Sequence, residues 1–182
     1  MALSLSPPAW VAVGLGARLL MVAVLVVSVK LNWTNHVNEL YDSSAYYDLK
    51  SYKYAAAAAI IGAASGLLQI PIAVYLLFES KRMTTSLLIL NISMYADMVV
   101  SLVLASGVGA GFGGSNDASQ IVDVLTWEDN RNSERRKDLD SYYGGGIVAT
   151  VFLLIGMLLS MCAAVVSVRL RARAAANDLD DV

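Results

Sequence analysis

The chain has 182 residues, of which 57% are hydrophobic, and its mean hydropathy is +0.59. So much apolar surface cannot be hidden inside a soluble globule of this size, so the composition excludes an ordinary soluble domain and places the chain in a bilayer. The formal net charge is only −2, and the single cysteine, Cys162, excludes an intrachain disulfide, a C-x-x-C redox pair and a thiolate zinc site.

Four apolar runs follow one another along the chain, and each is near or above the roughly 20 residues that cross a hydrocarbon core. They cover residues 9–29, 54–78, 84–110 and 146–168. We therefore predict an all-α membrane protein with a single four-transmembrane-helix bundle over residues 1–182. The first run has no basic segment before it and no small-residue cleavage pattern after it, so we interpret it as a membrane anchor and not as a signal peptide.

Four spans place both termini on one side of the membrane, and the basic residues indicate which side. Five lie on the side of the termini, within a turn or two of helix ends: Lys81, Arg82, Arg169, Arg171 and Arg173. Seven lie on the other side but are spread over two long loops: Lys30, Lys50, Lys53, Arg131, Arg135, Arg136 and Lys137. Because charges next to the membrane dominate orientation, we predict cytoplasmic termini.

This orientation assigns each segment outside the spans to one side of the membrane. Residues 30–53 and 111–145 become extracellular loops, residues 79–83 a short cytoplasmic loop and residues 169–182 a cytoplasmic tail. The tail carries three arginines and then three aspartates, so its predicted attraction to anionic lipid is partly offset.

The second extracellular loop begins and ends in glycine clusters and carries seven acidic residues against four basic ones. This composition is typical of a solvated connector. As an alternative, the stretch 118–127, "ASQIVDVLTW", has the pattern of a short helix on the membrane surface. In the first loop, Tyr52 and Tyr54 stand at the entry to the second span, where they are expected to act as interfacial anchors.

Two charges lie deep inside the apolar runs, Arg18 in the first and Asp97 in the third. A charge at the membrane centre costs roughly 2.5–3.5 kcal/mol, so such residues are normally paired or face a cavity. The first and third helices run in the same direction, and counting from the starts of their runs places the two charges about 6 Å apart in depth. An arginine side chain spans that difference, and its guanidinium can donate two hydrogen bonds to one carboxylate. We predict an intramembrane ion pair between neighbouring helices.

Small residues spaced four apart predict close helix packing, because they let backbones approach one another. In the third helix such a stripe runs through Ser93, Asp97, Ser101, Ala105 and Gly109. The other predicted packing residues are Gly14 in the first helix, Gly62 and Gly66 in the second, and Gly156, Ser160 and Ala164 in the fourth. Together they indicate a tight bundle without a wide aqueous pore.

The chain resembles the plant Casparian strip membrane domain protein-like (CASP-like) family, which is itself similar to the MARVEL domain proteins. The resemblance rests on the four-span topology and on "GARLLMV" around Arg18, "MYADMVV" around Asp97 and "YKYAAAAAIIGAASGLLQ" at the second span. It implies a plant plasma-membrane protein without known catalytic activity that forms homo- and hetero-oligomers. The founding members of the family build membrane scaffolds that gather cell-wall-modifying enzymes. The chain lacks the Glu-x-Leu-Pro-Phe-Phe-like first-loop signature and the outer-loop cysteines of the founding members. The Arg and Asp positions and the helix pattern therefore support a general scaffold or membrane organiser, whereas the features tied to Casparian strips are missing from the sequence.

Two functional hypotheses follow. The first is a non-enzymatic plasma-membrane scaffold in the lipid bilayer that associates with itself and with related membrane proteins, and that recruits partners such as cell-wall or extracellular enzymes. The second is a small oligomeric transporter or channel in which Asp97 titrates along a path lined by Ser93, Ser101 and Gln69. No nucleophile with a base, metal cluster or phosphate loop is visible, so we predict no enzyme activity, no cofactor, no metal and no nucleic-acid partner.

Overall fold

The computed structural model describes residues 7–34, 50–79, 87–126 and 133–180, and each of these stretches is one helix. The helices are α1 (Pro7–Thr34), α2 (Lys50–Glu79), α3 (Leu87–Thr126) and α4 (Ser133–Asp180). Each contains a stretch long and apolar enough to cross a membrane: Ala9–Thr34, Lys50–Tyr75, Asn91–Asp117 and Ser141–Arg173. The predicted all-α fold with four membrane spans is confirmed. Most of the predicted loop 30–53 and the predicted loop 79–83 after Glu79 lie outside the described residues.

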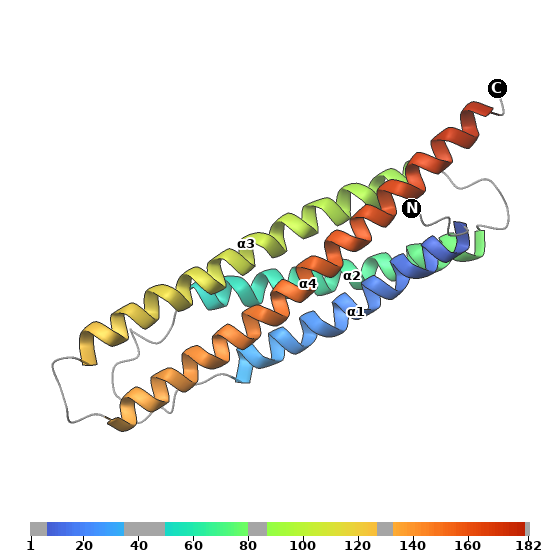
Figure 1. Cartoon of the computed structure of the whole chain (residues 1–182). Coiled ribbons are helices and arrows are strands. Elements are labelled where there is room, and N and C mark those ends of the chain that lie inside the picture. The colour runs from blue at the N-terminus through green and yellow to red at the C-terminus, as the bar shows by residue number, and fades with distance from the viewer. Residues whose placement is uncertain (1–6, 35–49, 80–86, 127–132, 181–182) are drawn as a thin grey trace, which may run out of the picture.

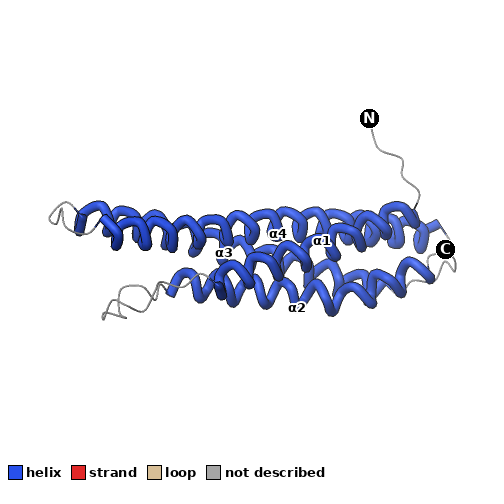
Figure 2. Tube along the Cα trace, turned by 90° about the horizontal axis from the view of Figure 1, so that it is seen from below, coloured by secondary structure: helices blue, strands red, loops and turns tan. Residues whose placement is uncertain are grey.

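The four helices lie side by side and alternate in direction (Figures 1 and 2). Each packs against two neighbours, in the order α1, α2, α3, α4 and back to α1. α2 and α4 approach each other briefly across one diagonal of the bundle, whereas α1 and α3 occupy the other diagonal and, over the helical segments described, have no backbone packing between them. α1 begins and α4 ends at the same end of the bundle, which we call the terminus end.

The buried positions of the helices repeat every seven residues, at spacings of three and four. In α1 they are Val11, Gly14, Arg18, Met21, Leu25 and Ser28. In α2 the same rule gives Tyr52, Ala55, Ala59, Gly62, Gly66, Gln69 and Ala73. This spacing is the pattern of left-handed helix packing, which most membrane bundles adopt.

The predicted four-residue stripe on α3 is wrong beyond Ser101. Ala105 and Gly109 are exposed, and the buried face continues through Leu104 and Val108. Four residues turn a helix by about 40° more than a full turn, so a strict four-residue stripe leaves the interface after two steps.

Leucines set against glycines form the middle of the core. Leu25 of α1 and Leu104 of α3 are 0% exposed, and Leu153 of α4 is 1% exposed. A Cβ atom placed on Gly62 of α2 would lie 2.8 Å from Leu104 Cδ2, and one on Gly156 of α4 would lie 2.5 Å from Leu25 Cδ2. The glycines therefore provide the volume that the leucine side chains fill.

The second predicted loop, 111–145, is helical over its described residues and not an irregular connector, because the helices on both sides extend into it. Residues 111–126 continue α3, and residues 133–145 belong to α4. The alternative of a separate surface helix at 118–127 is also wrong as far as Thr126, because these residues continue α3 without a break. Residues 111–126 and 133–145 contain no proline, so none of them lacks the backbone N–H that a helix uses.

Some glycines of the two clusters that border this predicted loop lie at points of close helix contact. A Cβ on Gly111 would lie 2.5 Å from Thr150 Oγ1, and one on Gly146 would lie 2.5 Å from Cζ of Tyr52. Tyr52 is therefore a core residue, 5% exposed, and not the predicted interfacial anchor. Tyr54 is 50% exposed, as expected of an anchor.

Candidate functional site

The guanidinium of Arg18 lies inside the bundle and contacts the other three helices. Its Nε donates a hydrogen bond to Gln69 Oε1 in α2 at 2.9 Å. Its Nη2 donates to Asp97 Oδ2 in α3, with 2.6 Å between the atoms. The side chains of Arg18 and Asp97 are only 7% and 5% exposed. The fold thus brings together the two deep charges that the sequence singles out.

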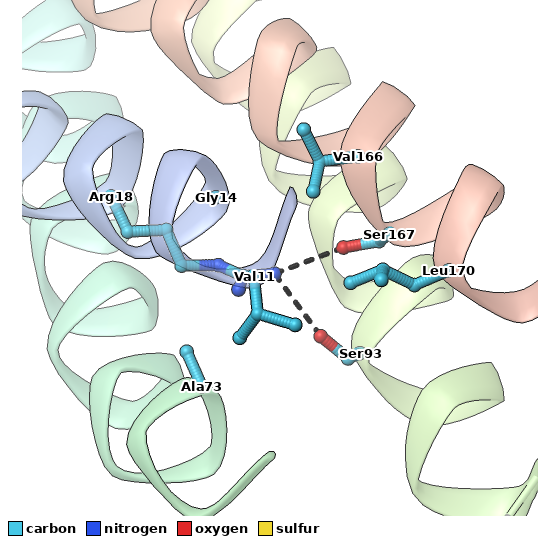
Figure 3. Close-up of a pocket in the computed structure, with 8 residues that line it drawn as sticks. All are labelled: Val11, Gly14, Arg18, Ala73, Ser93, Val166, Ser167 and Leu170. Atoms are coloured by element: carbon cyan, nitrogen blue, oxygen red, sulfur yellow. Dashed lines mark hydrogen bonds between the residues drawn. The ribbon is translucent and has the colours of Figure 1, made fainter. Parts of the chain in front are cut away.

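Two serines complete this site (Figure 3). Ser93 Oγ of α3 accepts a hydrogen bond from Arg18 Nη2 at 3.1 Å. Ser167 Oγ of α4 accepts from the same nitrogen at 3.0 Å and donates to Asp97 Oδ2 at 2.6 Å. Ser167 therefore bridges the base and the acid. We call Arg18, Gln69, Ser93, Asp97 and Ser167 the polar centre; its five side chains come from all four helices.

The ion pair differs from the prediction in its path and in its geometry. It does not join neighbouring helices, because α1 and α3 are diagonal and the Arg18 side chain crosses the bundle axis to reach Asp97. It uses one atom pair, Nη2 with Oδ2, in place of two parallel hydrogen bonds. A guanidinium on the axis meets acceptors from the helices on either side, so its fan of donors is shared among Gln69, Asp97 and the serines.

The charges of Arg18 and Asp97 make the hydrogen bonds of the polar centre important for the stability of the bundle. Leaving one ion of a buried pair without its partner costs about 3–5 kcal/mol, because the remaining charge is desolvated and uncompensated. Here the opposite charges neutralise each other, and hydrogen bonds to charged groups contribute about 1.5–3 kcal/mol each. The same contacts can form only when all four helices are in place. The polar centre therefore couples the stability of the bundle to its complete assembly.

A second polar contact lies one turn away, between α3 and α4. Ser101 Oγ donates to the backbone oxygen of Asp97 at 2.8 Å and lies 2.9 Å from Ser160 Oγ. Ser101 and Ser160 are 8% and 2% exposed. These two predicted packing residues therefore lie together at the helix contact beside the polar centre.

The predicted packing glycines also lie at helix contacts. Gly62 and Gly156 border the leucine core described above. A Cβ on Gly14 would lie 3.0 Å from Val166 Cγ1 of α4, and one on Gly66 would lie 2.6 Å from Met21 Cε of α1. Each of the four glycines thus faces a side chain of another helix.

Sequence reasoning missed Ser167 and considered Gln69 only as part of a transport path. Ser167 follows Ser160 by seven residues, the repeat that the buried faces obey. A seven-residue pattern applied to the fourth span would have placed Ser167 on the same face as Ser160. The four-residue pattern led to Ala164 instead, which is only partly buried.

A cavity of about 10 Å³ adjoins the polar centre on the side of the terminus end. Residues of all four helices line it, among them Val11, Ala73, Ser93 and Leu170 (Figure 3). This volume corresponds to about one water molecule, which needs polar partners such as Arg18 and Ser93. The space is too small for a metabolite.

The fold and the site define a class of protein: a four-span membrane bundle whose first and third helices share a buried ion pair. The model of the Casparian strip membrane protein domain matches residues 8–136, a stretch that includes both Arg18 and Asp97. The chain belongs to this family of multi-pass plant membrane proteins.

Curated relatives agree with this assignment. The chain is 27% identical to CASP-like protein 4D1 of Ricinus communis, over 83% of this chain and 84% of that protein. It is 28% identical to CASP-like protein 4D1 of Arabidopsis lyrata subsp. lyrata, over 78% and 77% of the two chains. It is 27% identical to CASP-like protein 4D2 of Arabidopsis thaliana, over 89% and 92% of the two chains. No solved structure gives a significant match.

Proposed function

We propose that this protein is a non-enzymatic scaffold of the plasma membrane, with cytoplasmic termini, that associates with itself and with related four-span proteins. In this role it organises the surrounding membrane and recruits partners, including cell-wall or extracellular enzymes. Membership of the Casparian strip membrane protein domain family supports this class of function.

The observation that carries the proposal is the way in which the polar side chains of the bundle are used. Gln69, Ser93 and Ser167 accept hydrogen bonds from Arg18, and Ser101 of α3 shares a hydrogen bond with Ser160 of α4. These bonds hold the four helices as one unit, and the cavity beside them has room for about one water molecule. A closed, rigid bundle suits a building block whose work is done on its outer surface.

The outer surface of α3 offers a contact for a second copy of the chain. Ala105, Gly109 and Gly113 are spaced four apart and are exposed on the bundle surface. A Cβ placed on Gly109 or Gly113 would meet nothing within 4 Å. Small residues at this spacing let the helices of two membrane proteins approach closely. Ala105 and Gly109, which the sequence pattern placed in the interior, thus lie on the outer surface and support self-association there.

Self-association can be tested by adding bulk to this outer stripe. We expect Gly109→Leu with Gly113→Leu to reduce the ladder of cross-linked oligomers in membranes, while the thermal stability of the monomer in detergent is retained. The control is Gly16→Leu, because a Cβ on Gly16 of α1 also meets nothing within 4 Å. An absent ladder in the wild-type protein would contradict the scaffold proposal. Equal loss of the ladder with Gly16→Leu would contradict the choice of surface.

The transport hypothesis is less well supported, because the side chains proposed for its path are engaged with one another. Ser93 and Gln69 bond to Arg18, and Asp97 bonds to Arg18 and Ser167. Reconstitution into liposomes distinguishes the two functions. Substrate- or ion-dependent flux through the wild-type protein that Ser101→Ala reduces would favour transport, whereas the scaffold proposal expects no flux.

A further inference from the structure

An aromatic and basic cluster lies at the terminus end of the bundle, where α1 begins and α4 leaves it. Cζ of Arg169 is 5.0 Å from the ring centroid of Trp10, and Cζ of Arg173 is 5.9 Å from the same centroid. Trp10 is the second residue of the α1 span, and Arg173 is the last residue of the α4 span. The cluster therefore lies at the level where the apolar part of both helices ends.

The chemistry of this cluster is that of a receptor for an anion with several oxygen atoms. Both arginines are exposed residues at the surface of the bundle. The indole N–H of Trp10 is buried and, within the described part of the chain, has no acceptor. A buried donor without a partner costs about 1–3 kcal/mol. The N–H points outward in the plane of the ring, so an oxygen that reaches this edge of the indole would satisfy it.

We propose that Trp10, Arg169 and Arg173 form a binding site for the headgroup of an anionic phospholipid. Tryptophan favours the membrane interface, and basic sites between membrane helices bind anionic headgroups. A phosphodiester supplies the oxygen acceptors, and its acyl chains lie along the exposed apolar residues of α1 and α4, such as Val13 and Val165. A free phosphate shares the headgroup chemistry but has no such apolar contact.

The fold separates Arg169, the inner arginine of this cluster, from the acidic end of the tail, whereas Arg173 lies only about 7.5 Å along the helix from Asp178. α4 continues as one helix to Asp180 and projects beyond the other helices (Figure 1). Asp178 is nine residues after Arg169, which places it about 14 Å farther along the helix axis. That separation exceeds the Debye length of about 8 Å at physiological ionic strength. The aspartates therefore weaken the attraction between Arg169 and an anionic headgroup less than the net charge of the tail alone would indicate.

Arg171 provides a matched control within the same segment. Its side chain lies on another face of α4, where Nη1 is 3.8 Å from Met94 Sδ of α3. Replacing it with glutamine removes the same charge from the same level of the same helix. Bulk electrostatic attraction would respond equally to all three arginines, whereas the proposed site depends on Arg169 and Arg173.

The test uses Trp10 as the reporter in the full chain, after Trp33→Phe and Trp127→Phe leave it as the sole tryptophan. The protein is reconstituted into phosphatidylcholine vesicles with a small mole fraction of brominated phosphatidylglycerol, or of brominated phosphatidylcholine for comparison. The fluorescence of Trp10 is quenched by bromine nearby. Stronger quenching by brominated phosphatidylglycerol than by brominated phosphatidylcholine measures the enrichment of the anionic lipid near Trp10. We expect enrichment that falls by about fivefold for Arg169→Gln and again for Arg173→Gln, the effect of losing one basic residue near a membrane surface.

Each outcome decides for or against the proposal. The site is supported if Arg171→Gln leaves the enrichment of anionic lipid unchanged and Arg169→Gln combined with Arg173→Gln abolishes it. No enrichment in the reporter protein, or an equal loss with Arg171→Gln, overturns it. Inorganic phosphate added to pure phosphatidylcholine vesicles distinguishes the source: a change in Trp10 fluorescence without lipid enrichment would assign the cluster to a free anion and overturn the lipid proposal. Thermal melting of each variant checks that the bundle is intact.

Discussion

At the scale of single residues, Arg18 has contacts that no other type of side chain could make. Its planar group carries donors in several directions, which suits a position on the bundle axis where Gln69, Ser93, Asp97 and Ser167 approach from three helices. The ammonium of a lysine would carry the same charge but would donate from one nitrogen only, whereas Arg18 uses Nε for Gln69 and Nη2 for the other three acceptors.

Removing one charge of the pair should destabilise the bundle strongly. We expect Asp97→Asn and Arg18→Leu each to cost about 3–5 kcal/mol, because each leaves the other ion buried without its counterion. Ser101→Ala is the milder comparison, since it removes one interhelical hydrogen bond, worth on average about 0.6 kcal/mol in a membrane protein. Unfolding by denaturant in detergent micelles measures the three losses on one scale.

Exchanging the charges tests whether the pairing itself is what matters. We expect Arg18→Asp combined with Asp97→Arg to recover part of the surface expression that each single change removes. The neutral partners favour recovery, because the Gln69 amide and the Ser167 hydroxyl can donate as well as accept hydrogen bonds. If the double variant were as defective as either single one, direct pairing would not be what stabilises the bundle.

At the scale of the helices, the glycines of α3 divide into two functional groups according to the face on which they lie. Gly107 is buried, and a Cβ there would be 2.6 Å from Cβ of Ala58, an atom fixed to the backbone of α2. Gly109 is exposed, and a Cβ there would meet nothing within 4 Å. Both residues are glycines and they lie two positions apart on the same helix. Only the direction in which each faces distinguishes them.

This difference gives a matched pair of substitutions. We expect Gly107→Ala to destabilise the bundle, because α2 and α3 must separate to admit the methyl group. We expect Gly109→Ala to leave stability unchanged or to raise it by up to about 1 kcal/mol, the difference in helix propensity between alanine and glycine. Thermal unfolding of both variants as detergent-solubilised monomers checks this, and an equal loss at both positions would contradict the assigned helix faces.

At the scale of the whole molecule, two of the four helices are at least about twice as long as a membrane requires. α3 has 40 residues and α4 has 48. At 1.5 Å per residue these helices are about 60 and 72 Å long, twice the thickness of a hydrocarbon core of about 30 Å. By length and hydropathy, the span of α3 ends at Asp117 and that of α4 begins at Ser141, so the helical residues 118–126 and 133–140 lie outside the stretches apolar enough to cross a membrane. This helical pair is where we expect extracellular partners to bind.

The proposed orientation predicts which end of the molecule is accessible from outside the cell. In a Cys162→Ala background, we expect a membrane-impermeant maleimide to label Ser119→Cys on intact cells and to label Ala176→Cys only after the cells are permeabilised. Both positions are exposed, so lack of labelling cannot arise from burial in the bundle. Labelling of Ala176→Cys alone on intact cells would reverse the orientation.

The sequence by itself determined the four spans and the two charges that meet, because apolar length and the cost of a buried ion are properties of the residues alone. Only the tertiary structure decided that the pair crosses a diagonal, that Ser167 joins it, and that the glycines of 111–146 continue helices instead of ending them. The reason is physical: a glycine or a serine has the same local propensity on either face of a helix. Its role depends on which neighbouring helix lies within a few ångströms of it.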